Sequence, residues 1–98
     1  SGGGASGNGP SFSLAGRDAL SLPKPAYPGN EQGVIVVAVT VDKYGKVTNA
    51  EPGVQGTNTY NPDLMKAARE AALKARFNAD PKAAAFQKGT ITYRFVLD

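Results

Sequence analysis

Residues 33–42, GVIVVAVTVD, are the feature that most constrains the fold. Every residue from Val34 to Val39 is apolar, and all but Ala38 are β-branched. Such residues favour strands, and a continuous apolar run is typical of a strand that lies in the middle of a sheet or is covered on both faces. With 98 residues, the chain can form one small domain around this strand.

The residues that follow predict a hairpin. Segment 42–46, DKYGK, has the composition of a turn, with Gly45 suited to a left-handed position. Residues 47–50 return as a second strand, which Glu51 and Pro52 are expected to end because proline cannot donate to a ladder. This strand is short and poor in apolar residues, so we expect it at an edge of the sheet.

A single helix is predicted from residue 62 to about residue 77. Asn61 can cap it, Pro62 fits its first turn, and Asp63 favours the positive end of its dipole. One face carries small apolar side chains, so the helix can lie close to a sheet. The residues of this face are Leu64, Ala68, Ala71, Ala72 and Ala75.

The last strand is predicted over residues 90–97, TITYRFVL, after a loop over residues 78–89. Apolar residues alternate with mostly polar ones in this segment, which is typical of a half-buried strand. The apolar face consists of Ile91, Tyr93, Phe95 and Leu97.

Together these elements predict an α+β domain over residues 11–98, with a small, mostly antiparallel sheet and one long helix packed on one face. In the simplest three-stranded sheet (order 2-1-3), strand 33–42 lies in the centre. Strand 47–50 and strand 90–97 flank it, and they run parallel to each other after a right-handed crossover.

The N-terminal residues divide into two parts. Residues 1–10 are rich in glycine and uncharged, so we expect a flexible linker there. Phe12 and Leu14 alternate with serines, which predicts a short extra strand and a four-stranded sheet.

Strand 90–97 is expected at an outer edge, where it is long, free of proline and charged only at Arg94. Unpaired edges of this kind are templates for pairing with another chain. Two interpretations stay open. Segment 11–17, SFSLAGR, can fold back and cover the edge, or a partner strand can dock there by β-augmentation. Both hold if the local segment is displaced by the partner.

Several kinds of chemistry are excluded. The chain has no cysteine and no histidine, so it cannot form disulfides, a zinc site of nitrogen and sulfur ligands, or a Ser-His or Cys-His nucleophile. Its carboxylates are not paired for acid-base work, and we expect no enzyme, cofactor or metal. The net charge of +3 comes from scattered basic residues, so nucleic-acid binding is not expected. No apolar run approaches the roughly 20 residues that span a bilayer, so we expect no membrane insertion by this fragment.

The order of these motifs resembles the C-terminal domain of TonB proteins, in the form common in Bacteroidetes, over roughly residues 17–97. The motifs are GRDALSLPKPAYP (16–28), GVIVVAVTVDKYGKV (33–47), AAREAALKARF (67–77) with FNADP (77–81), and GTITYRF (89–95). Many relatives have a first helix after the Tyr-Pro step, for which this chain has little room.

The resemblance implies a periplasmic domain of an inner-membrane-anchored energy transducer. An ExbB–ExbD-type motor would act through the N-terminal part of such a protein. The domain would grip the Ton box of TonB-dependent outer-membrane transporters by strand addition, and would support active uptake, for example of siderophores. The alternative is a TonB- or TolA-like adaptor domain with another envelope partner, structural or signalling.

The resemblance also implies a site. The family's Gln-Pro-x-Tyr-Pro motif corresponds to residues 24–28, KPAYP, with Lys24 in place of the glutamine, and PKPAYP (23–28) is predicted to be a stiff extended segment beside the binding edge. Arg94 either pairs with an acidic group of the partner or guards the edge as a solvated charge, and an open edge also allows weak homodimers. The predicted partner-binding residues are Pro25, Tyr27, Pro28, Thr90, Ile91, Thr92, Tyr93, Arg94, Phe95 and Val96.

Overall fold

The computed structural model describes residues 10–26 and 31–95, and its two longest strands form the centre of the fold. Strand β3 (Gly33–Asp42) pairs antiparallel with β6 (Phe86–Phe95) along all ten residues. The apolar run therefore lies inside a sheet, as predicted. Because β3 offers ten pairing positions, β6 begins at Phe86, and the prediction of a loop as far as residue 89 is wrong for its last four residues.

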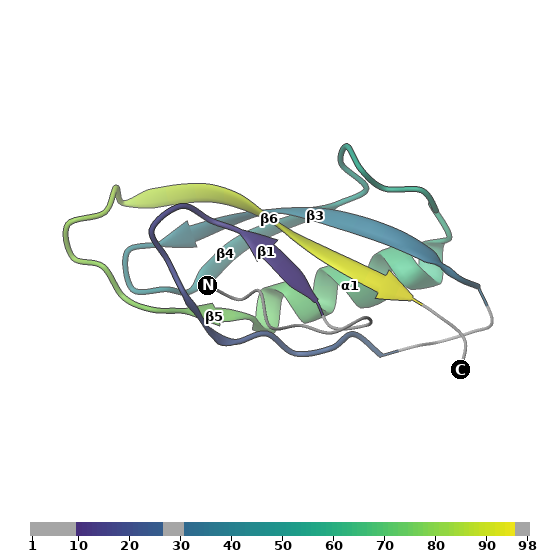
Figure 1. The fold of residues 1–98 in the computed structure, drawn as a ribbon, viewed down its shortest axis with the longest axis horizontal. Coiled ribbons are helices and arrows are strands. Elements are labelled where there is room, and N and C mark those ends of the chain that lie inside the picture. Colours follow the sequence, from purple (N-terminus) through teal and green to yellow (C-terminus); the bar gives the residue numbers. More distant parts are fainter. Residues whose placement is uncertain (1–9, 27–30, 96–98) are drawn as a thin grey trace.

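The main sheet has the order β1-β6-β3-β4 and is antiparallel throughout. Strand β1 (Ser11–Ser13) and strand β4 (Val47–Pro52) lie at its two edges (Figure 1). The predicted α+β class, the central position of β3 and the extra N-terminal strand are confirmed. Strand β4 runs on to Pro52, beyond the predicted end, because proline is tolerated on an edge strand.

The hairpin between β3 and β4 has the predicted glycine geometry. Gly45 adopts φ +89° and donates its amide to the Asp42 carbonyl at 3.0 Å. The Asp42 carboxylate accepts the amides of Tyr44 and Lys46 at 3.0 and 2.9 Å, which closes the turn.

Helix α1 (Pro62–Lys74) covers one face of the sheet, mainly beneath β4 and β3 (Figure 1). Its start is as predicted: the Asn61 side chain accepts the amides of Asp63 and Leu64 at 2.9 and 3.2 Å. Its buried face consists of Leu64, Ala67, Ala68, Ala71 and Ala72.

The helix ends at Lys74, about three residues before its predicted end. Ala75 is extended, and strand β5 (Arg76–Phe77) pairs with β2 (Ala19–Ser21), which the sequence did not predict. The amide of Phe77 donates to the Gly45 carbonyl at 2.9 Å, and its side chain is buried. Helical propensity in this segment is therefore overridden by a tertiary pairing.

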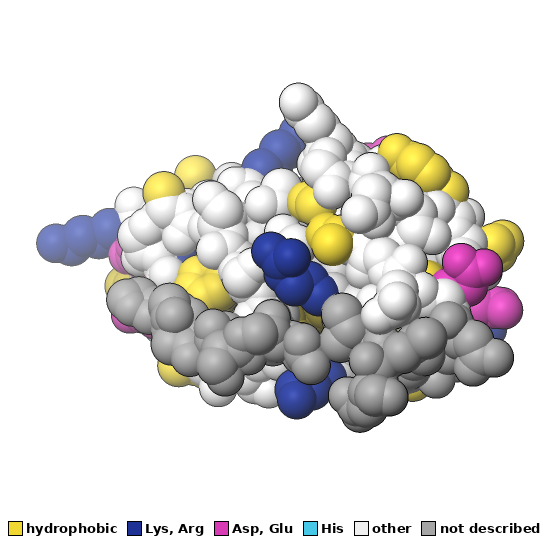
Figure 2. Space-filling model, turned by 45° about the vertical axis from the view of Figure 1, so that its right-hand side comes forward, with side chains coloured by type: hydrophobic (Ala, Val, Ile, Leu, Met, Phe, Trp, Pro, Cys, Tyr) yellow, Lys and Arg dark blue, Asp and Glu magenta, His cyan; other side chains and the backbone are white. Residues whose placement is uncertain are grey.

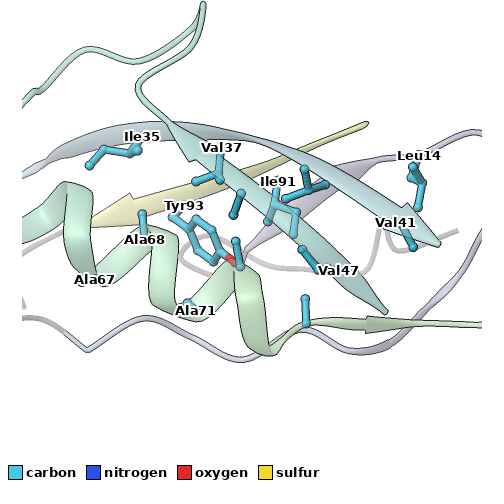
Figure 3. Close-up of a cluster of buried hydrophobic side chains, with 14 of the residues drawn as sticks. Leu14, Ile35, Val37, Val41, Val47, Ala67, Ala68, Ala71, Ile91 and Tyr93 are labelled. Carbon is cyan, nitrogen blue, oxygen red and sulfur yellow. The ribbon is translucent and has the colours of Figure 1, made fainter. Parts of the chain in front are cut away.

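The core lies between the sheet and the helix. Figure 3 shows Tyr93 reaching from β6 toward α1, and Leu14 at the end of the cluster where Val41 lies. Strands β3, β4 and β6 and helix α1 all contribute buried side chains. Leu14, directly after β1, is buried with them, and Phe12 of β1 packs against the cluster, so the N-terminal segment is joined to the core.

Candidate peptide-binding edge

Strand β6 has one edge filled by β3 and a second edge on which β1 lies (Figure 1). The ladder between β1 and β6 comprises Ser11↔Thr92, Phe12↔Ile91 and Ser13↔Thr90. It thus engages three of the ten positions of β6. The interpretation that SFSLAGR covers this edge is confirmed for those positions.

Side chains as well as backbone hold β1 in place. The Phe12 ring meets the Phe77 ring edge to face, with 5.3 Å between centroids and 66° between planes. Leu14, just after the strand, is buried in the main core. Ser11 and Ser13 point the other way and are exposed. The strand therefore has one apolar and one polar face, as its alternation predicted.

Glycine at position 89 lets β1 approach β6 closely. A Cβ atom on Gly89 would collide with the carbonyl oxygen of Ser13 and with the side chain of Leu14. Two residues earlier in β6, the side-chain amide of Gln87 donates to the Ala15 carbonyl at 2.6 Å. The path of β1 is thus shaped by the backbone of β6 itself.

On the opposite side of the sheet, the part of β3 that extends beyond β4 is already occupied by the chain itself. Beyond the end of β4, the amides of Gly53 and Val54 donate to the Val36 carbonyl at 3.0 and 3.2 Å, and Asn58 donates to the Val34 carbonyl at 2.9 Å. Strand β4 itself ends in Pro52. The β6 edge, on which β1 forms three pairs, is therefore the candidate edge for strand addition.

The predicted site residues of β6 divide between the two faces of the sheet. Ile91, Tyr93 and Phe95 point inward and are buried, so they can offer a partner their backbone. Thr90 and Thr92 are half-buried on the other face, and Arg94 is exposed there. Val96 lies outside the described residues.

Tyr93 is fully buried, and its hydroxyl has no hydrogen-bond partner among the described residues. Burial raises the pKa of this phenol well above its usual value, because the charged form would be poorly solvated. Tyr93 is therefore a neutral core residue at physiological pH.

The proline segment lies along the helix. Residues 23–26 and one side of α1 line a hollow of about 130 Å³; the helix residues of its lining are Ala67, Glu70, Ala71 and Lys74. The predicted residues Tyr27 and Pro28, and the predicted turn at 28–30, lie outside the described residues. Pro25 and the β6 edge are thus carried by different elements.

The role of Arg17 was not predicted from the sequence. Its side chain is 5% exposed, and its guanidinium donates to the Asn78 carbonyl at 2.9 Å and to the Asp42 carbonyl at 3.1 Å. Asp18 and Asn78 exchange further hydrogen bonds at 2.8 and 3.0 Å. The GRD and FN motifs, which are 60 residues apart, are therefore two halves of one contact.

The described residues offer no other obvious chemistry. Within residues 10–26 and 31–95, no group of three or more Asp or Glu side chains could hold a metal ion. In the same part of the chain, no helix has the length and apolar character needed to cross a bilayer. On the face in Figure 2, the Lys and Arg side chains stand apart from one another and form no basic stripe.

Comparison with known families agrees with this architecture. A family model described as Gram-negative bacterial TonB protein C-terminal matches residues 18–97. The matched region includes α1, β6 and the central hairpin, whereas β1 and Arg17 precede it. No curated protein and no solved structure matches the chain. Since the family model covers most of the 98 residues, the chain belongs to the family of TonB C-terminal domains.

Proposed function

We propose that this domain is the periplasmic, peptide-binding part of a TonB-type energy transducer. It grips the Ton box of an outer-membrane transporter by adding that peptide as a strand to the β6 edge, and it transmits force without chemistry. An ExbB–ExbD-type motor supplies the force through the inner-membrane anchor, and the result is active uptake. The family match over residues 18–97 is the observation that carries this proposal.

The geometry of β6 supports the proposal. Backbone pairing in a sheet tolerates many sequences and loads several hydrogen bonds side by side, which suits a peptide that must be pulled. Strand β6 is fixed by ten pairs with β3, the centre of the sheet, so a load on its other edge passes directly into the core.

Two further contacts belong to the proposal. Arg94 is exposed on the polar face of β6, where it can pair with an acidic side chain of the partner strand. Tyr27 and Pro28 contact the partner in this proposal, and they follow directly on residues 23–26, which line a hollow with α1. Thr90 to Val96 supply the pairing edge.

The test is an NMR titration of the ¹⁵N-labelled domain with a peptide that carries the Ton box of a transporter from the same organism. We expect amide shifts concentrated in residues 90–95 and in β1, whose place the peptide takes. A scrambled peptide of the same composition is the control. Shifts confined to α1 or to β4 would move the site, and an unchanged spectrum at millimolar peptide would contradict the proposal.

The alternative, an adaptor domain with another envelope partner, also predicts an unchanged spectrum with Ton box peptides. In this alternative the β6 edge still binds a peptide, but the peptide comes from a protein other than a transporter. The alternative would be favoured if the immobilised domain retrieved an envelope protein that is not a transporter and did not bind Ton box peptides. Nucleic-acid binding is not proposed, because no basic stripe is seen on the face in Figure 2.

A further inference from the structure

We infer that β1 is an in-chain occupant of the peptide site, and that it shows which side chains the site accepts. The peptide that replaces β1 is an extended segment antiparallel to β6. It carries two apolar side chains two residues apart, the first of them aromatic, between small polar residues. This inference rests on the proposed function, in which the partner adds a strand to the β6 edge.

The first side-chain site is the one that Phe12 fills. Its ring lies 5.3 Å from the ring of Phe77 in an edge-to-face arrangement, a geometry that favours an aromatic side chain over an aliphatic one. Phe77 is itself 2% exposed and fixed by the hydrogen bond that its amide donates to the Gly45 carbonyl. The wall of this site therefore stays in place when β1 leaves.

The second site is the one that Leu14 fills. Leu14 is 6% exposed and lies against Gly89, at the Val41 end of the core (Figure 3). A branched aliphatic side chain fits such a site, and a polar one would be buried without partners. Because side chains on one face of a strand recur every second residue, the two sites together select an aromatic-x-aliphatic pattern.

The structure also marks where the exchangeable segment ends. Arg17 is buried and bonded to the carbonyls of Asn78 and Asp42, which anchors the chain just after β1. Gly16 lies between β1 and Arg17. Its φ is +74°, no atom lies within 4 Å of where a Cβ would be, and the backbone can change direction there. Residues 10–16 can therefore leave β6 while residues 17–26 keep their contacts.

Strand β1 forms few contacts with β6 for a strand that competes with a partner peptide. It forms three pairs, and the residue before it, Pro10, has no N–H to extend the ladder. Residues 1–9 hold no apolar side chain larger than alanine. Strand β1 also precedes the region that the family model matches, whereas β6 lies within it. A partner with more pairing residues can therefore replace it.

The first test uses the full chain with Phe12→Ser and Leu14→Ser together, and the synthetic peptide PSFSLAG, which copies residues 10–16. We expect the double variant to bind this peptide at least 10-fold more tightly than the wild type, because the competing strand no longer fits its own site. The peptide PSSSSAG should not bind. A folded double variant that does not bind PSFSLAG, or that binds both peptides equally, would overturn the inference.

A second test does not depend on the folding of that variant. The chain has no cysteine, so Ser11→Cys with Thr92→Cys allows one disulfide, between Cα partners of an antiparallel pair. At millimolar PSFSLAG, amide shifts at residues 90–92 are expected in the reduced protein and not in the oxidised one. Thr40→Cys with Asn49→Cys, a β3–β4 pair on the same face, is the control that should respond equally in both states.

The same locked protein separates the two proposals. A Ton box peptide that binds the oxidised and the reduced protein equally would keep Ton box recognition, place it away from Thr90–Thr92, and overturn the role of β1. Binding of PSFSLAG to the reduced protein alone, with no binding of any Ton box peptide, would support the role of β1 and contradict the proposed function.

Discussion

The rings of Phe12 and Phe77 meet edge to face, with 5.3 Å between their centroids. Phe12 belongs to the N-terminal strand β1, and Phe77 to the short strand β5 that follows the helix. This contact joins the segment that covers the candidate peptide edge to the buried core. The strength with which β1 covers the edge can therefore be measured through the free energy of unfolding.

Phe12→Ala is expected to lower the free energy of unfolding by about 2 kcal/mol. The figure is less than the ~3–5 kcal/mol of a fully buried phenylalanine, because Phe12 is half-buried. Phe86→Ala is the matched control, since its ring is exposed, and should change stability by less than about 0.5 kcal/mol. Urea unfolding measures both, and equal losses would show that the ring contact adds nothing.

Tyr93→Phe is expected to raise the free energy of unfolding by about 1 kcal/mol. The substitution removes a buried hydroxyl that has no partner among the described residues and keeps the ring in the core. Thermal unfolding at neutral pH measures the effect. A loss of more than about 1 kcal/mol would mean that the hydroxyl makes a stabilising bond.

The same pair of proteins should differ in alkali. Burial raises the pKa of Tyr93 in the folded state above its unfolded value of about 10, so the folded protein keeps a proton that the unfolded chain releases. The stability that this contributes is complete below pH 10 and falls above it, by up to about 1.4 kcal/mol per pH unit. Wild type should therefore lose stability faster than Tyr93→Phe between pH 10 and 11.5, and parallel curves would refute this account.

Gly45→Ala is expected to cost about 3 kcal/mol or more. A Cβ atom at this turn would strike the backbone carbonyl of Phe77, and φ is +89°. Gly16→Ala shares the positive φ but meets nothing within 4 Å, so it should cost about 1 kcal/mol from backbone strain alone. Chemical denaturation of the two variants separates collision from strain, and equal costs would rule out the collision.

Arg17→Ala is expected to lower stability by about 2–3 kcal/mol, because it removes the guanidinium donor of the Asn78 carbonyl and one of the two donors of the Asp42 carbonyl. Arg76 is a close control: its guanidinium also donates to two carbonyls, at 3.2 and 2.8 Å, but it is exposed and its bonds are local. Arg76→Ala should cost less than about 0.5 kcal/mol. Similar losses for both arginines would contradict the anchoring role of Arg17.

Arg94→Ala is expected to weaken binding of an acidic Ton box peptide about 3-fold, in line with an exposed ion pair of up to ~1 kcal/mol. The loss should shrink at high salt. Lys88→Ala, on the same face of β6 but near the turn after β1, should leave affinity unchanged. Calorimetric titration at two salt concentrations would decide, and equal effects of the two substitutions would favour a general charge effect.

Local signals in the sequence accounted for the elements that are built locally. The Asn61-Pro62-Asp63 cap, the left-handed Gly45 turn and the apolar run of β3 each carry their cause within a few residues, so each was predicted correctly. The alternation in residues 91–95 likewise placed its apolar side chains in the core.

The errors arose where a distant partner decided the structure. The helix stops at Lys74 because Phe77 donates a hydrogen bond to the Gly45 carbonyl and its strand β5 pairs with β2. Strand β6 begins at Phe86 because β3 offers ten pairing positions. No residue within three or four positions of these boundaries gives a local signal that would predict them.

The candidate site shows the same division. By itself the sequence determined the fold class, the central strand, the alternating face of β6 and the resemblance to TonB proteins, because periodicity and caps are properties of neighbouring residues. Tertiary structure decided that β1 covers Thr90–Thr92, that residues 23–26 lie on α1, and that Arg17 is buried. These depend on which surfaces meet when the chain folds, since backbone donors and apolar side chains can be satisfied by partners far away in the sequence.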